Sequence, residues 1–439
     1  QIANPDVVRA RINPLSHYLI WGKSEGRSTV KSHTEQPTLN RVISSTAIMA
    51  GKVENVPSVQ VDVIEPVRSA RPIIVMVDAF YPQPDKDSGS LDQVNFARIF
   101  QNLGYEVAFA SLIDFAPQHK TKQPLAQLGV TCVTGEEYRN LEEYVFLNAE
   151  KIHAFFLSRF NFGGTWIDKA RRLCPDAQII FNTVDLHHVR EEREAQLKDD
   201  MEALAKASLT REQELACIDA ADVTIVVSEA ELALLDEILP SADVRVVPLI
   251  RDVRSRARPG FEARDGIAFV GGFQHQPNID AVTHFLDEVW PMVLARLPNL
   301  TLYVIGSHMP LQLSSRLDSN VEWIGYVPEL EPWLDRVLAT VAPLRYGAGA
   351  KGKVVSSLIN GVPCVASTIA AEGMNIAAGD GILIAENSRA FVDRIADITT
   401  DAGLWQSTSR QGFDTGARLY SLDRGVELIG QIVSRVAAE

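Results

Sequence analysis

The sequence has little of what marks secreted, membrane-spanning or nucleic-acid-binding proteins. Its apolar runs stay short of the roughly 18 residues that cross a bilayer, and its start lacks the basic and apolar regions of a signal peptide. Basic side chains are in deficit, 42 against 56 acidic ones, and the net charge of −14 excludes a broad surface for nucleic acid. The few cysteines have no paired metal-binding spacing and are interpreted as buried thiols in the cytoplasm: Cys132, Cys174, Cys217 and Cys364.

Apolar runs alternate with helical stretches from Pro72 onward. The first series of strand-like runs is IIVMVDAF, YEVAFAS, HAFFLS, AQIIFNTV, VTIVVS and VRVVP. A second series begins near Gly266 and consists of IAFVGG, LTLYVIG, VEWIGY, VLATVAPL, VPCVAS and GILIA. Continuous apolar runs are typical of parallel strands covered on both faces. The pattern predicts an α/β protein with two Rossmann-like, doubly wound domains that face a central cleft, where ligands bind.

The length of 439 residues and the changes of pattern predict four segments. Residues 1–69 are expected to be a short helical unit and a linker, because periodicity is lost after residue 27. Residues 70–255 and 256–415 are the two predicted Rossmann-like domains, divided at a basic stretch with a Pro-Gly break. Residues 416–439 are predicted to form a C-terminal helix, and packing back on the N-terminal domain is one of its two options.

A glycine-rich loop follows the strand that ends at Leu344 and leads into a helix. Glycines let the backbone approach a ligand closely, and free N–H groups at a helix start favour an anion. The loop is also a local excess of positive charge in an acidic chain, which suits a diphosphate. The alternative is a tight strand-to-helix turn with solvated lysines. The residues of this candidate site are Arg345, Gly347, Gly349, Lys351, Gly352 and Lys353.

Three phosphate-binding patterns overlap in residues 347–353. The GxxxxGK pattern of a P-loop is met, but Val354 stands where Ser or Thr would bind magnesium. The kinase pattern GxGxxGxV is met without a downstream HRD or DFG motif. A dinucleotide GxGxxG is met as well, with Glu372 about twenty residues further on, although that motif normally opens its domain. Their common element is a backbone cradle for phosphate.

The segment 347–373 resembles the donor-binding region of glycosyltransferase family 4, retaining enzymes with the GT-B fold. The most similar subgroup has Gly-x-Gly-x-(Arg/Lys)-x-Lys, then a helix, Gly-x-Pro, a strand and Ala-Glu-Gly. The stretch FVGGFQHQPNIDAVTHFLDEVWP is similar to the opening of the family's second domain, which puts Gly271 and Gly272 beside the donor phosphates. The matching positions of the first motif are Gly347, Gly349, Lys351, Lys353, Gly361, Pro363, Ala371, Glu372 and Gly373.

The resemblance extends over about residues 72–435 and implies roles in the first domain. The stretch TVDLHHVREERE places Asp185, His187 and His188 beyond a central strand, where they could contact donor sugar or acceptor; loop histidines that cap backbone are the alternative. Glu372 would receive a sugar or ribose hydroxyl, or cap a helix. We interpret the charged run 190–214 as a solvated helix face, with a membrane-facing helix as the alternative.

One departure from the family pattern concerns ribose recognition. The family usually has glutamate where this chain has Ser356, and many members have a carboxylate where it has Ala348. A hydroxyl makes a weaker hydrogen bond than a carboxylate. A further predicted cleft loop, between the first strand and its helix, could meet donor or acceptor through its amides, or a serine could cap the helix. Its residues are Ser88, Gly89 and Ser90.

These observations predict a glycosyltransferase that moves a hexose-type sugar from a nucleoside diphosphate sugar to a glycan or other acceptor. The resemblance implies retention of configuration. We expect Lys351, Lys353 and the loop amides to take the place of a metal ion, the donor substrate to need no further cofactor, and the acceptor to bind the first domain. Segments similar to NPDVVRARINPLSHYLIWGKSEGR occur beside such domains in surface-polysaccharide proteins, which points to polysaccharide synthesis in the cytoplasm or at the inner face of the membrane. The alternatives are a sugar-nucleotide epimerase and a non-catalytic GT-B module of a larger protein.

Overall fold

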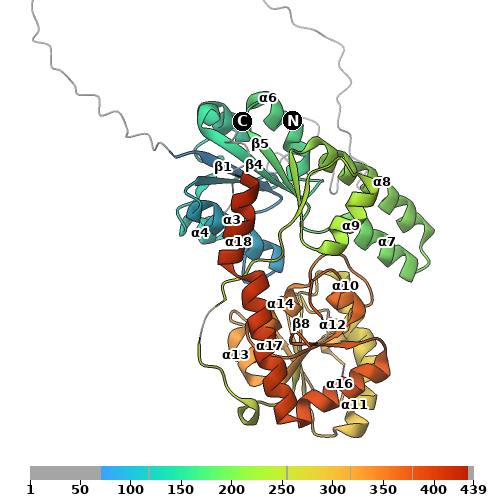
Figure 1. The fold of residues 1–439 in the computed structure, drawn as a ribbon. Helices are drawn as coiled ribbons and strands as arrows, with labels where there is room; N and C mark the ends of the chain where they lie inside the picture. The colour runs from blue at the N-terminus through green and yellow to red at the C-terminus, as the bar shows by residue number, and fades with distance from the viewer. Residues whose placement is uncertain (1–70, 117–118, 254–255, 317, 378, 434–439) are drawn as a thin grey trace, which may run out of the picture. The chain divides into compact units, whose positions relative to one another are not determined.

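The computed structural model describes residues 71–116, 119–253, 256–316, 318–377 and 379–433. The predicted helical unit and linker, residues 1–69, lie outside this part of the chain. The described residues form two sheets of parallel strands, and strands and helices alternate along the chain (Figure 1). The predicted pair of doubly wound sheets is thereby confirmed.

The first sheet has seven parallel strands in the order β3-β2-β1-β4-β5-β6-β7. All six residues of β1 are buried, as the continuous apolar run IIVMVD predicts for a central strand. The strands are β1 Ile73–Asp78, β2 Glu106–Ser111, β3 Thr131–Val133, β4 Ile152–Ser158, β5 Gln178–Asn182, β6 Val223–Val226 and β7 Val244–Val246. The helices are α3 Ser88–Asn102, α4 His119–Ala126, α5 Leu141–Asn148, α6 Ile167–Leu173, α7 His187–Leu197, α8 Met201–Ala220 and α9 Glu229–Ile238.

The second sheet has six parallel strands in the order β10-β9-β8-β11-β12-β13. They are β8 Ile267–Val270, β9 Leu302–Ile305, β10 Val321–Gly325, β11 Ala339–Ala342, β12 Cys364–Ser367 and β13 Ile382–Ala385. Its helices are α10 Gln276–His284, α11 Trp290–Arg296, α12 Leu311–Ser314, α13 Glu331–Arg336, α14 Gly352–Ile359, α15 Thr368–Ala371, α16 Ser388–Thr400 and α17 Ala402–Tyr420, with a π-helical turn at Phe285–Val289.

The helix at the end of the described chain, α18 Leu422–Val433, packs on the first sheet although it follows the second in sequence (Figure 1). Ile429 and Ile432 share a buried apolar cluster with Phe96 and Phe100 of α3. The connection from α17 to α18 passes Arg251, whose amide donates to the carbonyl of Tyr420 at 2.6 Å. The last helix therefore ties the two sheets together.

Strained backbone marks the carboxyl ends of two central strands. Arg159, directly after β4, has φ 65°, and Val184, close after β5, has φ 68°. A β-branched residue rarely adopts this left-handed conformation, because its side chain then clashes with the backbone. Such strain persists where surrounding contacts enforce it, and it gathers at functional sites. These two strand ends position the residues described below.

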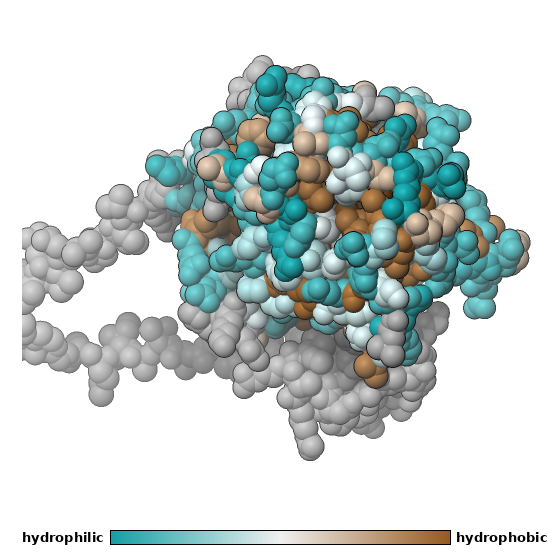
Figure 2. All heavy atoms as spheres, turned by 90° about the horizontal axis from the view of Figure 1, so that it is seen from below, coloured by the Kyte–Doolittle hydropathy of each residue, from teal (hydrophilic) through white to brown (hydrophobic). Residues whose placement is uncertain are grey.

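The surface is mixed in polarity. Figure 2, which views the molecule from below Figure 1, shows hydrophobic residues scattered among a larger number of hydrophilic ones. None of the described helices combines the length and the apolar character needed to span a bilayer.

Candidate functional site

The glycine-rich loop and the first turn of α14 meet the turn after β8. The loop needs glycine, because Gly347 has φ 145° and Gly349 has φ 65°. The ammonium of Lys353 donates to Oδ1 of Asn278 at 2.8 Å. The amide nitrogen of Asn278 in turn donates to the carbonyl of Gly272 at 2.8 Å. Two segments that the sequence offered as parts of one phosphate site are thus joined through a residue that sequence reasoning did not single out.

Lys353 holds a positive charge in surroundings that disfavour it. Burial lowers the pKa of Lys353 to about 8, and the nearby Lys351 ammonium acts in the same direction. Within the described chain its hydrogen-bond acceptor is a neutral amide oxygen rather than a carboxylate. Lys353 also belongs to the first turn of α14, where free backbone N–H groups favour an anion. An anionic group placed here would raise the pKa of Lys353. It would also accept hydrogen bonds from the free N–H groups of α14.

The other two predicted cations of the loop are arranged differently. The Lys351 ammonium donates to the carbonyl of Ala348 at 2.9 Å and also to that of Gly349. These hydrogen bonds stabilise the conformation of the glycine-rich loop. Burial lowers the pKa of Lys351 to about 8, opposed by the nearby carboxylates Glu231, Glu372 and Asp185. Arg345 is exposed and pairs with Asp280 of α10. Contact of Lys351 or Arg345 with a donor phosphate stays a prediction.

Ser356 lies on α14, one turn beyond Lys353, so the two side chains share a helix face. It is partly buried, and its carbonyl accepts a hydrogen bond from Asn360. Its role in ribose recognition stays a prediction.

Arg193 of α7 connects the first half of the molecule to the glycine-rich loop. It donates to the carbonyl of Gly347 at 2.7 Å and to both carboxylate oxygens of Glu372 at 2.6 and 3.0 Å. Glu372 itself follows α15, so it does not begin a helix. Nearby, the amide of Glu229 donates to the carbonyl of Gly373 at 3.3 Å. The Glu372 carboxylate is therefore held at the junction of the two halves by a residue from the charged run.

The charged run 190–214 is only in part a solvated helix face, which corrects the sequence interpretation. Glu214 of α8 is fully buried, and Arg190 and Arg193 are partly buried. Arg190 pairs with the carboxylate of Asp185, which lies beyond β5. Each of these side chains pairs with an oppositely charged or polar group of the site. For Arg193 that group, Glu372, is 179 residues further along the sequence.

Glu214 holds both predicted histidines at the start of α7. Its oxygens lie 2.6 Å from Nδ1 of His188 and 3.3 Å from Nδ1 of His187. The amides of both histidines also donate to this carboxylate. Burial opposes it, but the hydrogen bonds from the histidines hold the pKa of Glu214 below its ordinary value. For His187, burial is likewise outweighed by Asp185 and Glu214, which raise its pKa.

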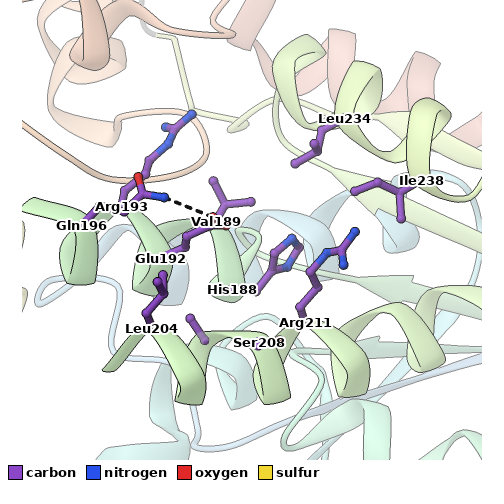
Figure 3. A pocket seen from close by; sticks show the side chains of 11 residues that line it. His188, Val189, Glu192, Arg193, Gln196, Leu204, Ser208, Arg211, Leu234 and Ile238 are labelled. Carbon is purple, nitrogen blue, oxygen red and sulfur yellow. Dashed lines mark hydrogen bonds between the residues drawn. The ribbon is translucent and has the colours of Figure 1, made fainter. Parts of the chain in front are cut away.

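A cavity of about 610 Å³ lies among α7, α8 and α9. Figure 3 shows the side chains of His188 and Arg211 directed into it, while Arg193 extends toward the second half of the chain. Nδ1 of His188 is hydrogen-bonded to Glu214, so Nε2 is the ring nitrogen that a ligand in this cavity would contact. Its remaining lining residues are Val189, Glu192, Gln196, Leu204, Ala207, Ser208, Leu234 and Ile238.

The predicted cleft loop lies at the start of α3 and contacts the start of α14. The residue that caps α3 is Asp87, which accepts from the amide of Ser90 at 2.8 Å and from its hydroxyl at 2.7 Å. The cap is therefore an aspartate and not the serine considered from sequence. Asp87 precedes both serines, and its carboxylate accepts a hydrogen bond from the amide of Ser90 in the first turn. A Cβ added to Gly352 would lie 2.6 Å from Oγ of Ser88, so this loop approaches α14 closely.

A second cavity, of about 410 Å³, opens beside this loop at the carboxyl ends of β1 and β4. Asp78, the last residue of β1, is buried and pairs with Arg159 through both oxygens. Gln274 and His308, from loops after β8 and β9, complete the lining, so both sheets contribute. Within the described residues, no group of three or more His, Cys, Asp or Glu side chains is placed to hold a metal ion.

Comparisons with known proteins agree with this fold. Residues 264–401 match the family model described as Glycosyl transferases group 1. A similar solved structure is sucrose-phosphate synthase from Thermosynechococcus elongatus, with 14% identity and a TM-score of 0.62 over 84% of this chain and 100% of that one. The chain has the GT-B fold. A mutant of S. aureus TarM in complex with Fondaparinux, alpha-GlcNAc-glycerol and UDP is similar at 10% identity and a TM-score of 0.66, over 82% and 99% of the two chains.

Another GT-B neighbour is HepE from Anabaena in complex with UDP and glucose, with 12% identity and a TM-score of 0.60 over 82% and 99% of the two chains. No curated protein matches by sequence. The family match spans all six strands of the second GT-B sheet and the glycine-rich loop. The sequence signal for a glycosyltransferase therefore falls on the half of the GT-B fold that contains Lys353.

Sequence reasoning missed several residues of this candidate site. Asn278 stood in the quoted stretch FVGGFQHQPNID, and its place just after a Pro in a helix's first turn was the available signal. Arg190 stood within the charged run, five residues after its partner Asp185. Arg193 stood in the same run, without a local sign that its partner is Glu372. Arg159 follows a strand, as site residues in α/β folds do, and that position could have marked it.

Proposed function

We propose that the protein transfers a sugar from a nucleoside diphosphate sugar to a glycan or glycoconjugate acceptor, with retention of configuration and without a metal ion. The observation that carries the proposal is the Lys353 ammonium at the start of α14, with an amide rather than a carboxylate as its partner. A diphosphate supplies the missing negative charge. The group 1 family match over this same segment supports glycosyl transfer among the reactions that release a diphosphate.

The site stabilises the leaving group as the reaction proceeds. The bond between the anomeric carbon and the diphosphate oxygen breaks, and the acceptor hydroxyl oxygen forms the new bond to that carbon while its proton passes to the departing diphosphate. Negative charge grows on the diphosphate during this step, so the Lys353 ammonium and the amides of α14 act most strongly in the transition state. In the proposed reaction Glu372 binds a hydroxyl of the transferred sugar, and its hydrogen bonds from Arg193 hold the carboxylate in one position.

The donor site is tested by calorimetric titration with UDP, GDP, dTDP and CMP, with and without EDTA. UDP is the first candidate, since it is the nucleotide bound in the TarM and HepE complexes. One diphosphate should bind in the presence of EDTA, and Lys353→Ala should weaken it by about ten- to a hundredfold, the value of a hydrogen bond to a charged group. The control is Lys206→Ala, which removes an exposed ammonium from α8. If no nucleotide binds at millimolar concentration, the donor site is not where we place it.

A non-catalytic module is the second candidate, favoured by Ser356 and Ala348 at positions where the family has carboxylates. Turnover of the nucleotide sugar that corresponds to the bound diphosphate separates the two readings. Release of diphosphate that depends on an added acceptor identifies transfer, whereas a changed donor sugar without acceptor identifies an epimerase. The anomeric configuration of the product, read by NMR, tests retention. Binding without any turnover would leave the module as the function.

A further inference from the structure

The second cavity has the size and the place of a substrate site. Its volume of about 410 Å³ lies within the roughly 300–1,000 Å³ range of ligand pockets. It opens at the carboxyl ends of β1 and β4, where α/β sheets bind ligands. It also adjoins the donor site, because Lys86 of its lining places its carbonyl oxygen 3.9 Å from a Cβ built on Gly272. A molecule in this cavity would lie beside the proposed diphosphate.

Two phenylalanine rings stand among the polar groups of this lining. Phe80 follows β1 and is 57% exposed, so its ring is accessible to a ligand. Phe162, in the loop after β4, is partly buried and lines the same cavity. The C–H groups on one face of a pyranose ring carry partial positive charge, and they pack well on the negative face of an aromatic ring. An exposed ring in a cavity that also has polar groups is therefore suited to a sugar.

The charges of the lining balance. Asp78 is 3% exposed, and both of its oxygens accept hydrogen bonds from Arg159, so this pair presents no net charge. The remaining ionic groups are one cation, Lys86, and one carboxylate, Asp87, whose oxygens already accept from Ser90. Uncharged side chains add to the hydrogen-bonding surface, among them Gln83, Gln93 and Gln274. This lining offers donors and acceptors for hydroxyl groups without the excess of positive charge that a phosphate needs.

We propose that this cavity binds a neutral pyranose unit of the acceptor, which stacks on Phe80 and faces the donor across the Gly271–Gly272 turn. The acceptor is then a saccharide with free hydroxyl groups, rather than a sugar phosphate or an apolar chain. In this proposal Phe80 selects a ring with an apolar face, and the paired Asp78 and Arg159 belong to the same lining. This inference rests on the proposed function, because it names the acceptor class of the same site.

The test is saturation-transfer NMR on the full chain, without nucleotide, with the methyl pyranosides of glucose, galactose, mannose and N-acetylglucosamine as probes. At least one should give ring-proton signals at millimolar concentration, and glucose 6-phosphate should bind more weakly. Phe80→Ala should weaken binding about tenfold or more, a loss of stacking energy of about 1.4 kcal/mol. Phe80→Tyr keeps the ring and should bind as the unchanged protein does. The matched control is Phe146→Ala, which removes an exposed phenylalanine from α5.

Three results would overturn the acceptor assignment: no pyranoside binds, Phe80→Ala binds as well as the control, or glucose 6-phosphate binds best. UDP titration of the same samples keeps this outcome separate from the donor proposal. If UDP binds to Phe80→Ala as tightly as to the unchanged protein while pyranosides do not, the two sites are distinct. If pyranosides bind and UDP does not, the donor proposal fails and the saccharide site stands.

Discussion

The Lys353 ammonium and Oδ1 of Asn278 lie 2.8 Å apart, and this contact joins the first turn of α14 to the turn after β8. Because the acceptor is an amide, the positive charge stays available to a ligand. Asn278→Asp would place a carboxylate there, raise the pKa of Lys353 and cancel its charge. We expect UDP binding to weaken by about tenfold or more, and by more than in Asn278→Ala.

Calorimetry at pH 8 measures this difference. The control is Asn387→Asp, which adds the same charge at the N-cap of α16, where either side chain is accepted. Equal affinity of Asn278→Asp and the unchanged protein would show that the Lys353 charge does not reach the ligand.

Diphosphate binding should depend on pH through Lys353. Its pKa of about 8 in the free protein means that the ammonium is largely charged at pH 7 and largely neutral at pH 9.5. The ligand binds the charged form, so affinity should fall as pH rises through about 8, by up to about tenfold per unit. UDP titrations between pH 7 and 9.5 measure this slope. Lys353→Met should show a shallower slope, and an unchanged one would assign the dependence to Lys351, whose pKa is similar.

Gly306 should tolerate no side chain. A Cβ there would lie 1.9 Å from the carbonyl oxygen of Gly271, a contact that only a backbone shift relieves. We expect Gly306→Ala to lower the free energy of unfolding by about 2–4 kcal/mol and to weaken UDP binding, because it displaces the Gly271–Gly272 turn. Urea denaturation and calorimetry measure the two effects. Gly260→Ala, where an added Cβ meets nothing within 4 Å, should change neither.

Removal of Glu214 should destabilise the first half of the molecule. Glu214→Ala leaves His187 and His188 without their buried partner, and we expect a loss of about 3–5 kcal/mol at pH 7 in denaturant unfolding. Glu212→Ala removes an exposed carboxylate of the same helix and should have little effect. Because the folded pKa of Glu214 is lowered, its contribution is present above its ordinary pKa and is lost as pH falls through the folded value. The difference between the two variants should shrink in acid.

Arg193 and Glu372 should act as one unit. Both side chains are about one-third exposed, so their ion pair alone contributes about 0.2–1 kcal/mol. Arg193→Ala and Glu372→Ala should each lower kcat/KM. The kcat/KM of the double variant should be no lower than that of the more damaging single variant. Effects that simply add would show that Glu372 reaches its position without Arg193.

The sequence by itself determined the two sheets and the glycine-rich loop. Both are local patterns: buried parallel strands require continuous apolar runs, and the loop's turn requires glycine at Gly347 and Gly349. Strand β3 was not foreseen, because it has three residues and only Val133 is fully buried. So short a run carries no periodicity, and its pairing with β2 rather than its own composition makes it a strand.

Only the tertiary structure decided which charges work together. Asn278 and Lys353 are separated by 75 residues, and Arg193 and Glu372 by 179. The same is true of Glu214, which turns the two predicted histidines toward itself, and of Arg159, which meets Asp78 across two strands. A charged side chain has several stable positions in an unfolded or extended chain, and it takes one of them only when packing of the sheets brings its partner within hydrogen-bond distance and removes water from both.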